Sequence, residues 1–444
     1  MYLHAVSSLS RTLIMQILML KDYSNMIYAP PLCGKPYLYG SNAGVSVSSR
    51  LVATLTMHLR EAVLQEALQE SMVRFPQIAV CLKEEDGQLL FAPHAEAVRV
   101  CHADSSDLPA SFGLGEYLFR VTYRHRTIYF DFHKSLIDEY GMMAFAKSVI
   151  FRYIELCGYP IESDGTIKML SGSFFPAEAE DPMSGIDDIN ASRPVWYMDA
   201  KAVRLTSATS SLAPQQVAQV RIPVGKLRGE MAQLATLPVT YVAPVFSHAL
   251  FESAQGMIAQ GEYVVASVKI NMRPYFPSAT LRPFTTPVYL AYNRNLQDYP
   301  YGTVLMSQKK LLEAQLKPDT LAYSAQRQLS QIERAFDGTC AKEGVAKMFD
   351  GLSSMATYEV ASMGNVIFPD SMQRYVTEFY PVNPSGLYAY SVTIVNFKGE
   401  IVITIAGCNS VHALASRLAQ LLCGNDIAAY VSDEYEYTPV TDKF

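Results

Sequence analysis

One short segment, FDFHKSLIDEYG at residues 130–141, combines residue types that could carry out proton transfer. His133 ends an alternating apolar run, and Asp138 follows five positions later. A histidine at the end of a strand can take a proton from a hydroxyl near neutral pH, as acyl transfer to an alcohol requires. A simpler interpretation makes His133 a satisfied strand-end histidine and Asp138 the cap of the next helix. The segment alone favours the simpler interpretation.

Positioning these residues requires a strand before them and a helix after them. In a strand over 127–133, Ile128, Phe130 and Phe132 lie on one face, and the alternate residues, including His133, lie on the other. His133 would then be the last residue of a buried strand, where a ligand could reach it. Other elements of the first half are predicted from apolar periodicity and turn residues: a strand over 51–59, a helix that begins at 60 and has ended by Pro76, hairpins over 77–93 and 116–133, and a helix over 139–157.

The second half repeats this alternation of helices and strands. Residues 161–215 are rich in Ser, Gly, Asp, Pro and Ala, which predicts a crossover or linker. Strands mixed with helices and hairpins predict α/β layers in two lobes, not a purely parallel, doubly wound sheet. The elements expected after the linker are a helix over 241–260, a buried strand over 263–270, helical stretches over 306–355, a hairpin over 386–407 and a closing helix over 410–423.

Composition narrows the classes of partner. The chain has 444 residues, 50% of them hydrophobic, which is enough for two or three lobes with sizeable cores. A formal net charge of -6 leaves no global basic field for a nucleic acid, so none is expected as a partner. The apolar run LIMQILML at 13–20 is shorter than the roughly 20 residues that a membrane span needs, so we expect a peripheral helix or an upstream extension.

The cysteines and the absent motifs exclude several chemistries. Seven scattered cysteines form no CxxC pair, which argues against a zinc knuckle or a disulfide framework and favours reduced thiols in a cytoplasmic protein. The sequence contains no GxxxxGK[ST] phosphate loop, no HExxH and no GxSxG elbow. We therefore expect neither a metal site nor a bound cofactor.

Four segments, in order along the chain, carry a family resemblance. The stretch EYLFRVTYRHRTIYFDFHKSLIDEYGMMAFAKSVIFRYIELCG resembles the HHxxxDG region of the alcohol acetyltransferase-like proteins. These belong to the chloramphenicol acetyltransferase and condensation-domain superfamily. LREAVLQEALQESMVRFPQIAVCLK, VKINMRPYFPSATLRPF and YEVASMGNVIFPDSMQRYV are similar to three further segments of that family. The resemblance extends over about residues 45–425.

The resemblance implies a two-lobed chloramphenicol acetyltransferase-like fold, with mixed sheets covered by helices and a tunnel between the lobes. An acyl thioester, usually of coenzyme A, would enter from one side and an alcohol from the other. The motif histidine would act as the base, here His133, while Asp138 would pair with Arg273 to hold the loop. Asn271 and Ser362 would face the substrates, and so would Gly141, which matches the family's second glycine.

The chain also departs from the pattern. Counting back from Gly141 places Asp138 at the motif aspartate, so Glu139 replaces the motif glycine and Lys134 stands where a histidine is expected. Either a bulge absorbs the extra residue and His133 still faces the tunnel, or the base is lost. Glu139 could narrow the acyl path or add unwanted charge there.

Two functional classes therefore remain open. The first is an O-acyltransferase that moves an acyl group, acetyl for example, from coenzyme A to an alcohol hydroxyl. The second is an inactive relative that binds an acyl thioester or a protein partner, and an acyl carrier protein could replace coenzyme A as the donor. The predicted organisation is an N-terminal extension (1–40), an N-terminal lobe (41–175), a crossover linker (176–210) and a C-terminal lobe (211–444).

Overall fold

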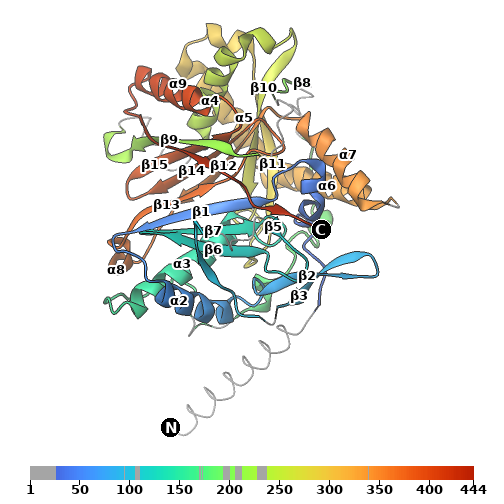
Figure 1. The fold of residues 1–444 in the computed structure, drawn as a ribbon. Helices are drawn as coiled ribbons and strands as arrows, with labels where there is room; N and C mark the ends of the chain where they lie inside the picture. The colour runs from blue at the N-terminus through green and yellow to red at the C-terminus, as the bar shows by residue number, and fades with distance from the viewer. Residues whose placement is uncertain are drawn as a thin grey trace, which may run out of the picture.

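The protein folds into two lobes stacked on one another, with the first half of the chain in one lobe and most of the second half in the other (Figure 1). The computed structural model describes residues 27–94, 96–105, 111–169, 172, 174–193, 201–205, 213–227, 238–338 and 340–444. The apolar run at 13–20 and part of the predicted linker lie outside the described residues. Among the described residues, no helix is both long and apolar enough to cross a bilayer.

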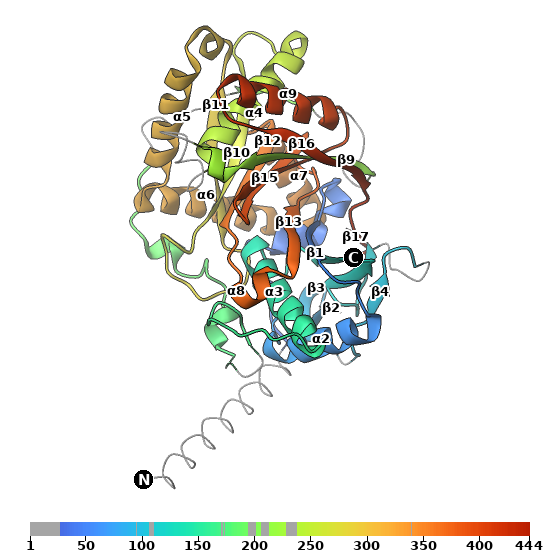
Figure 2. The same cartoon turned by 90° about the vertical axis from the view of Figure 1, so that its left-hand side faces the viewer.

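The first lobe is a five-stranded sheet with two helices packed on one face (Figure 2). Phe130 and Phe132 are at most 1% exposed and pack with Phe145 of the covering helix, as the alternation predicts. The sheet order is β13-β1-β7-β6-β4. Its elements are β1 (Ser48–Leu55), α2 (Glu61–Arg74), β4 (Val100–His102), β6 (Phe119–Arg124), β7 (Thr127–His133), α3 (Glu139–Leu156) and β13 (Val376–Val382). The separate hairpin is β2 (Val80–Glu85) and β3 (Gln88–Pro93).

The second lobe contains the larger sheet, in the order β11-β10-β12-β14-β15-β9-β16, with β8 paired to β10. Its strands are β8 (Lys201–Ala202), β9 (Gln215–Pro223), β10 (Glu262–Asn271), β11 (Thr285–Tyr292), β12 (Tyr358–Asn365), β14 (Tyr390–Phe397), β15 (Glu400–Gly407) and β16 (Tyr430–Tyr437). Its helices are α4 (Val239–Ser253), α5 (Tyr301–Gln315), α6 (Pro318–Phe336), α7 (Ala341–Ser353) and α9 (Val411–Gly424). The short α8 (Asp370–Gln373) precedes β13.

The two faces of the larger sheet differ in polarity. One face carries apolar side chains such as Val268 and Val360, which join the core under the helices. The alternate residues face the first lobe, and many of them are polar. Thr393 of β14, for example, donates to the carbonyl of Pro381 in β13, at 2.9 Å. The space between the lobes therefore has a polar wall on the side of the second lobe.

Two strands from the second half of the chain pair with strands of the first lobe and so connect the lobes. β13 completes the sheet of the first lobe by pairing with β1. After β16, the short β17 (Thr441–Asp442) pairs in parallel with β5 (Ser111–Phe112) of the first lobe. The sequence placed residues 211–444 wholly in the C-terminal lobe, so β13 and β17 depart from that division. Part of the predicted N-terminal extension (1–40) also packs in the first lobe, since Leu38 lies in the core of that lobe.

Candidate functional site

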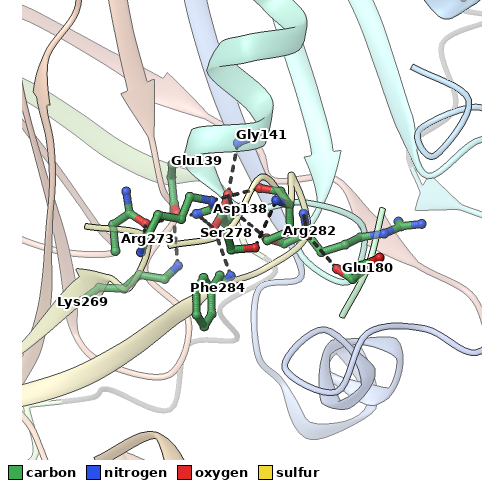
Figure 3. Close-up of polar contacts among 11 residues, drawn as sticks. Asp138, Glu139, Gly141, Glu180, Lys269, Arg273, Ser278, Arg282 and Phe284 are labelled. Atoms are coloured by element: carbon green, nitrogen blue, oxygen red, sulfur yellow. Dashed lines mark hydrogen bonds and ion pairs between the residues drawn. The ribbon is translucent and has the colours of Figure 1, made fainter. Parts of the chain in front are cut away.

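The site begins where β7 ends and α3 starts. Asp138 is extended (φ −92°, ψ −176°) and caps α3, because its Oδ1 accepts the N–H of Gly141 at 3.0 Å. Its Oδ2 accepts the N–H of Phe284, the residue directly before β11 in the second lobe, at 3.0 Å. One carboxylate thus joins the turn of the first lobe to a loop of the second (Figure 3).

Arg273 completes this arrangement, and the predicted pairing with Asp138 is present. Arg273 Nη1 and Nη2 donate to Asp138 Oδ2 and Oδ1 at 2.7 and 3.3 Å. The guanidinium also donates to the carbonyls of Thr280 and Arg282 and to Asn271 Oδ1. Arg273 and Asp138 are 9% and 7% exposed, so this is a buried ion pair whose donors and acceptors are well matched. The geometry of this pair fits a structural role, in which it holds the turn between β7 and α3 in place.

Glu139 makes a second contact between the lobes, directly beside the first. Its Oε1 accepts from Lys269 Nζ of β10 at 3.0 Å and from Asn383 Nδ2 at 2.8 Å. Burial alone would raise the pKa of Glu139, but Lys269 and the hydrogen bonds outweigh it and lower the pKa to about 2. Burial would lower the pKa of Lys269, yet Glu139 and Glu359 raise it. Glu139, which replaces the motif glycine, is therefore an ionised carboxylate whose charge is balanced by Lys269.

His133 is sealed away from the space between the lobes. It lies on the face of β7 that the alternation predicts, but the end of the chain covers it, and its ring is fully buried. Nδ1 is 2.6 Å from Ser135 Oγ, Nε2 is 3.2 Å from Asp442 Oδ2, and the rings of Phe112 and Phe444 pack on it. Burial lowers the pKa of His133 although Asp442 opposes this. The expectation that a bulge turns His133 toward the tunnel therefore differs from the observed geometry.

Lys134 occupies the position where a histidine is expected. It is the first residue after β7, and its N–H donates to the carbonyl of Val47 at 2.7 Å. Its Nζ donates to the carbonyl of Ser46 at 3.0 Å and lies 5.7 Å from the centre of the Tyr37 ring. Burial and the nearby Lys269 lower the pKa of Lys134 to about 8, against the opposing influence of two glutamates.

A small cavity of about 80 Å³ lies at the lobe boundary beside Asp138 and Glu139. Asn271 and Ser362 both line it, together with Glu139 and Lys269. Asn271 uses Oδ1 to accept from Arg273, and Ser362 Oγ accepts the N–H of Gly364 at 3.4 Å. The structure therefore brings the two predicted substrate contacts together.

Gly141, also predicted to contact substrate, packs against backbone instead. A Cβ at this position would lie 2.4 Å from the carbonyl oxygen of Leu281. Its smallness allows α3 to approach the loop that follows β10, and its N–H reaches Asp138. The glycine is needed for close packing of the lobes.

Sequence reasoning missed several members of this site. Lys269 and Asn383 carry no local motif, and only the fold brings them to Glu139. Arg282 is 1% exposed and donates to the carbonyl of Leu136 in the motif loop and to the hydroxyl of Tyr28. The one available signal was an arginine in an apolar stretch, LRPF, in a segment already assigned to the family.

Comparisons with known proteins place this geometry in a known fold. No family model matches the sequence. No curated protein matches it either. Similar solved structures include F. graminearum TRI101 complexed with coenzyme A and T-2 mycotoxin, with a TM-score of 0.58 and 11% identity over 91% of this chain and 99% of that chain. Polyketide synthase associated protein 5 from Mycobacterium tuberculosis has a TM-score of 0.56 and 11% identity over 89% and 97%.

A third similar structure is the starter condensation domain of rhizomide synthetase RzmA in complex with C8-CoA and Leu-SNAC. It has a TM-score of 0.54 and 14% identity, over 88% of this chain and 92% of that chain. The chain has the condensation-domain and chloramphenicol acetyltransferase-like fold. The predicted two-lobed fold is thereby confirmed. At these identities the likeness establishes the fold, and the chemistry must be argued from the residues of this chain.

Within the condensation-domain fold, the site has a frame that matches the motif described above and a centre that departs from it. The frame is the Asp138 and Arg273 pair at the strand, turn and helix of the motif. The centre contains Lys134 and the Glu139 and Lys269 pair, where the resemblance leads one to expect a histidine and a glycine. In the part of the chain that the structure describes, no group of three or more His, Cys, Asp or Glu side chains is arranged to hold a metal ion.

Proposed function

We propose that this protein is an acyltransferase that moves an acyl group from a coenzyme A thioester to an alcohol hydroxyl in the space between its lobes. The observation that carries the proposal is the buried Asp138 and Arg273 pair, which fixes the motif turn beside a cavity lined by Asn271 and Ser362. A motif turn held so firmly at the boundary of two lobes suits a site that must position two substrates.

The fold supports an acyl thioester as co-substrate. The F. graminearum protein was crystallised with coenzyme A, and the RzmA domain with C8-CoA. Transfer from such a thioester needs a proton acceptor for the hydroxyl and a donor near the developing oxyanion, but no resident cofactor. We assign the donor role to Asn271: its hydrogen bonds to Arg273 both use Oδ1, so the Nδ2 amide group can donate into the cavity.

Asp138 and Arg273 act in this proposal as positioning residues. Both side chains are occupied by one another and by backbone groups of the two lobes, so they hold the motif turn in place. Ser362 also lines the cavity, and we assign it to contact with the alcohol. Gly141 contributes by allowing the lobes to approach, and not by touching substrate.

A second candidate is a relative that binds an acyl thioester without turning it over. Two observations favour it: His133 is sealed by Asp442 and Phe444, and Glu139 is tied across the lobes to Lys269 and Asn383. An ion pair across the boundary between the lobes leaves less room there for two substrates. The cavity of about 80 Å³ is smaller than an ordinary ligand pocket, for which several hundred Å³ is typical.

Binding and turnover should be measured separately to decide between these candidates. Calorimetry with coenzyme A, acetyl-coenzyme A and octanoyl-coenzyme A reports binding, and a thiol-reactive dye reports release of free coenzyme A in the presence of a panel of alcohols. Acyl carrier protein loaded with the same acyl groups tests the alternative donor. We expect binding and acceptor-dependent release. Binding without release would favour the second candidate, and the absence of both would contradict the proposal.

The matched variants for this experiment are Asn271→Leu and Arg204→Met. Asn271→Leu removes the proposed donor, so release should fall about a hundredfold while binding of coenzyme A persists. Arg204→Met removes an exposed ion pair with Asp350, neither of which lines the cavity, and should leave release unchanged. A cytoplasmic location and an acyl carrier protein partner remain predictions from the sequence.

A further inference from the structure

The side chain of Lys134 is held at the lobe boundary by a neutral group. Its Nζ donates to the carbonyl of Ser46 at 3.0 Å. The nearby carboxylate of Glu139 pairs with Lys269 instead, at 3.0 Å. Lys134 and Lys269 thus lie in the same region, and Lys269 has the direct anionic partner. Lys134, which is held by a neutral carbonyl, is therefore the lysine that loses its proton more easily.

The groups around Lys134 come from four elements. Glu139 lies on α3, Lys269 on β10, Glu359 on β12 and Tyr37 on the 3₁₀ helix η1 (Lys35–Tyr39). Burial and Lys269 lower the pKa of Lys134, while Glu359 and Glu139 raise it, and the result is about 8. Desolvation next to a second cation is a recognised way of making a lysine amine reactive near neutral pH.

Buried polar atoms with no partner mark the same region. Ser46 Oγ and Asn383 Oδ1 each lack a hydrogen-bond partner, and both residues are at most 2% exposed. Ser46 is the residue whose carbonyl holds Lys134, and Asn383 is the residue whose amide holds Glu139. Buried polar atoms are normally satisfied, so these two oxygens are suited to receive a hydrogen-bonding group from a ligand.

We propose that Lys134 is the catalytic residue that accepts the proton of the acceptor hydroxyl. This assignment rests on the acyl transfer proposed above. The hydroxyl oxygen forms a bond to the thioester carbonyl carbon as its proton passes to the neutral amine of Lys134. The bond from that carbon to sulfur then breaks, and the ammonium group returns the proton to the leaving thiolate. The products are an ester and free coenzyme A, and Lys134 ends as a neutral amine.

The assignment predicts an alkaline pH profile. With a pKa of about 8, roughly a tenth of Lys134 is neutral at pH 7, and the neutral fraction increases until the pH passes that value. A histidine at the same position would already be largely neutral at pH 7. Coenzyme A release by the wild-type protein should therefore increase about fivefold between pH 7 and pH 8.

The test compares coenzyme A release from acetyl-coenzyme A and an active alcohol, between pH 6 and pH 10, in five proteins. These are the wild type, Lys134→His, Lys134→Arg, Lys134→Met and Lys147→Met. Lys134→Arg keeps the positive charge but cannot act as a base. Lys147 is the matched control, because burial lowers its pKa to about 8 as well, yet its Nζ bonds to the carbonyl of Ile367 outside the site.

The expected result is a distinct pattern across the five proteins. Lys134→Arg and Lys134→Met should lose about a hundredfold or more of the activity. Lys134→His should retain activity with its inflection moved about one pH unit or more toward acid, and Lys147→Met should match the wild type. Acetic anhydride labelling followed by mass spectrometry gives an independent readout in the wild type, where Lys134 should become reactive near pH 8 and Lys269 should not.

Two kinds of failure can be told apart. If the wild type releases coenzyme A and Lys134→Met does so with the same rate and pH profile, the assignment of Lys134 is overturned and the proposed function stands. If the wild type releases none with any donor or alcohol, the proposed function fails and the assignment fails with it. Labelling of Lys134 that begins only above pH 10 would overturn the assignment even where a variant does not fold.

Discussion

Asp138 and Glu139 are neighbours in sequence, and both carboxylates pair with a cation at or just beyond the end of β10, yet their surroundings differ. Asp138 accepts from a bidentate arginine and from two backbone N–H groups, so its position is fixed by both lobes. Glu139 accepts from a lysine and an amide and lies beside a cavity, another lysine and buried oxygens without partners. The surroundings of Asp138 therefore hold the turn in shape. The surroundings of Glu139 contain ionisable groups beside a cavity, where chemistry can occur.

The largest effect should come from breaking the first pair. Arg273→Met leaves the carboxylate of Asp138 buried without its cation, so the free energy of unfolding should fall by about 3–5 kcal/mol. Urea denaturation measures this. Arg204→Met is the control, because its partner Asp350 is exposed and the loss should stay below about 1 kcal/mol. Equal losses in the two variants would contradict the structural role of Arg273.

The next effect tests the close approach that the first pair requires. Gly141→Ala places a Cβ 2.4 Å from the carbonyl of Leu281, so the lobes must shift, at a cost of about 1–3 kcal/mol. Gly302→Ala, in the first turn of α5, meets open space and should be neutral or stabilising. Thermal unfolding of both variants checks this, and unchanged stability of Gly141→Ala would show that the contact is not tight.

Removing the charge of Glu139 should cost less. Glu139→Gln leaves Lys269 without its nearest anion, but Glu359 is still near and the lysine side chain is 19% exposed. We expect a loss of about 1–2 kcal/mol, and a coupling of about 0.5–2 kcal/mol in a double-mutant cycle with Lys269→Met. Urea denaturation of the four proteins gives this coupling directly. A coupling near zero would mean that the pair contributes nothing to joining the lobes.

The smallest effect is the pH dependence of the contribution that Glu139 makes to the free energy of unfolding in acid. The pKa of Glu139 is lowered from 4.5 to about 2 in the folded protein, so its stabilising effect is complete above about pH 4.5 and disappears as the pH falls toward 2. The stability difference between the wild type and Glu139→Gln should therefore narrow over this interval. Denaturation midpoints at several pH values test it, and a constant difference would exclude Glu139 ionisation as the cause.

The local periodicity of apolar residues was sufficient to predict the strand and the helix that carry the site. The alternation over 127–133 predicted β7 and its buried face, and the helix predicted over 139–157 is α3 (Glu139–Leu156). The pairing of Asp138 with Arg273 came from the family resemblance, because the two residues are separated by 135 positions and share no local pattern. Sequence reasoning worked best where one strand or one helix decides the outcome.

Contacts from remote segments were beyond such reasoning. Alternation placed His133 on the correct face of β7, but Asp442 covers it, 309 positions later. The partners of Glu139 come from β10 and from the residue after β13, and neither segment signals that it will meet α3. The identity of the residue that faces the lobe boundary, Lys134 or His133, therefore depended on packing that only the complete fold supplies.

The position of β13 late in the chain has a consequence for folding during synthesis. β1 (Ser48–Leu55) emerges early from the ribosome, whereas the strand that covers its outer edge follows roughly 320 residues later, about 15–60 s at ordinary rates of synthesis. During that interval an apolar strand edge is open to other chains. This first lobe should therefore depend on chaperones during synthesis, and slower translation of the second half should increase its aggregation in the cell.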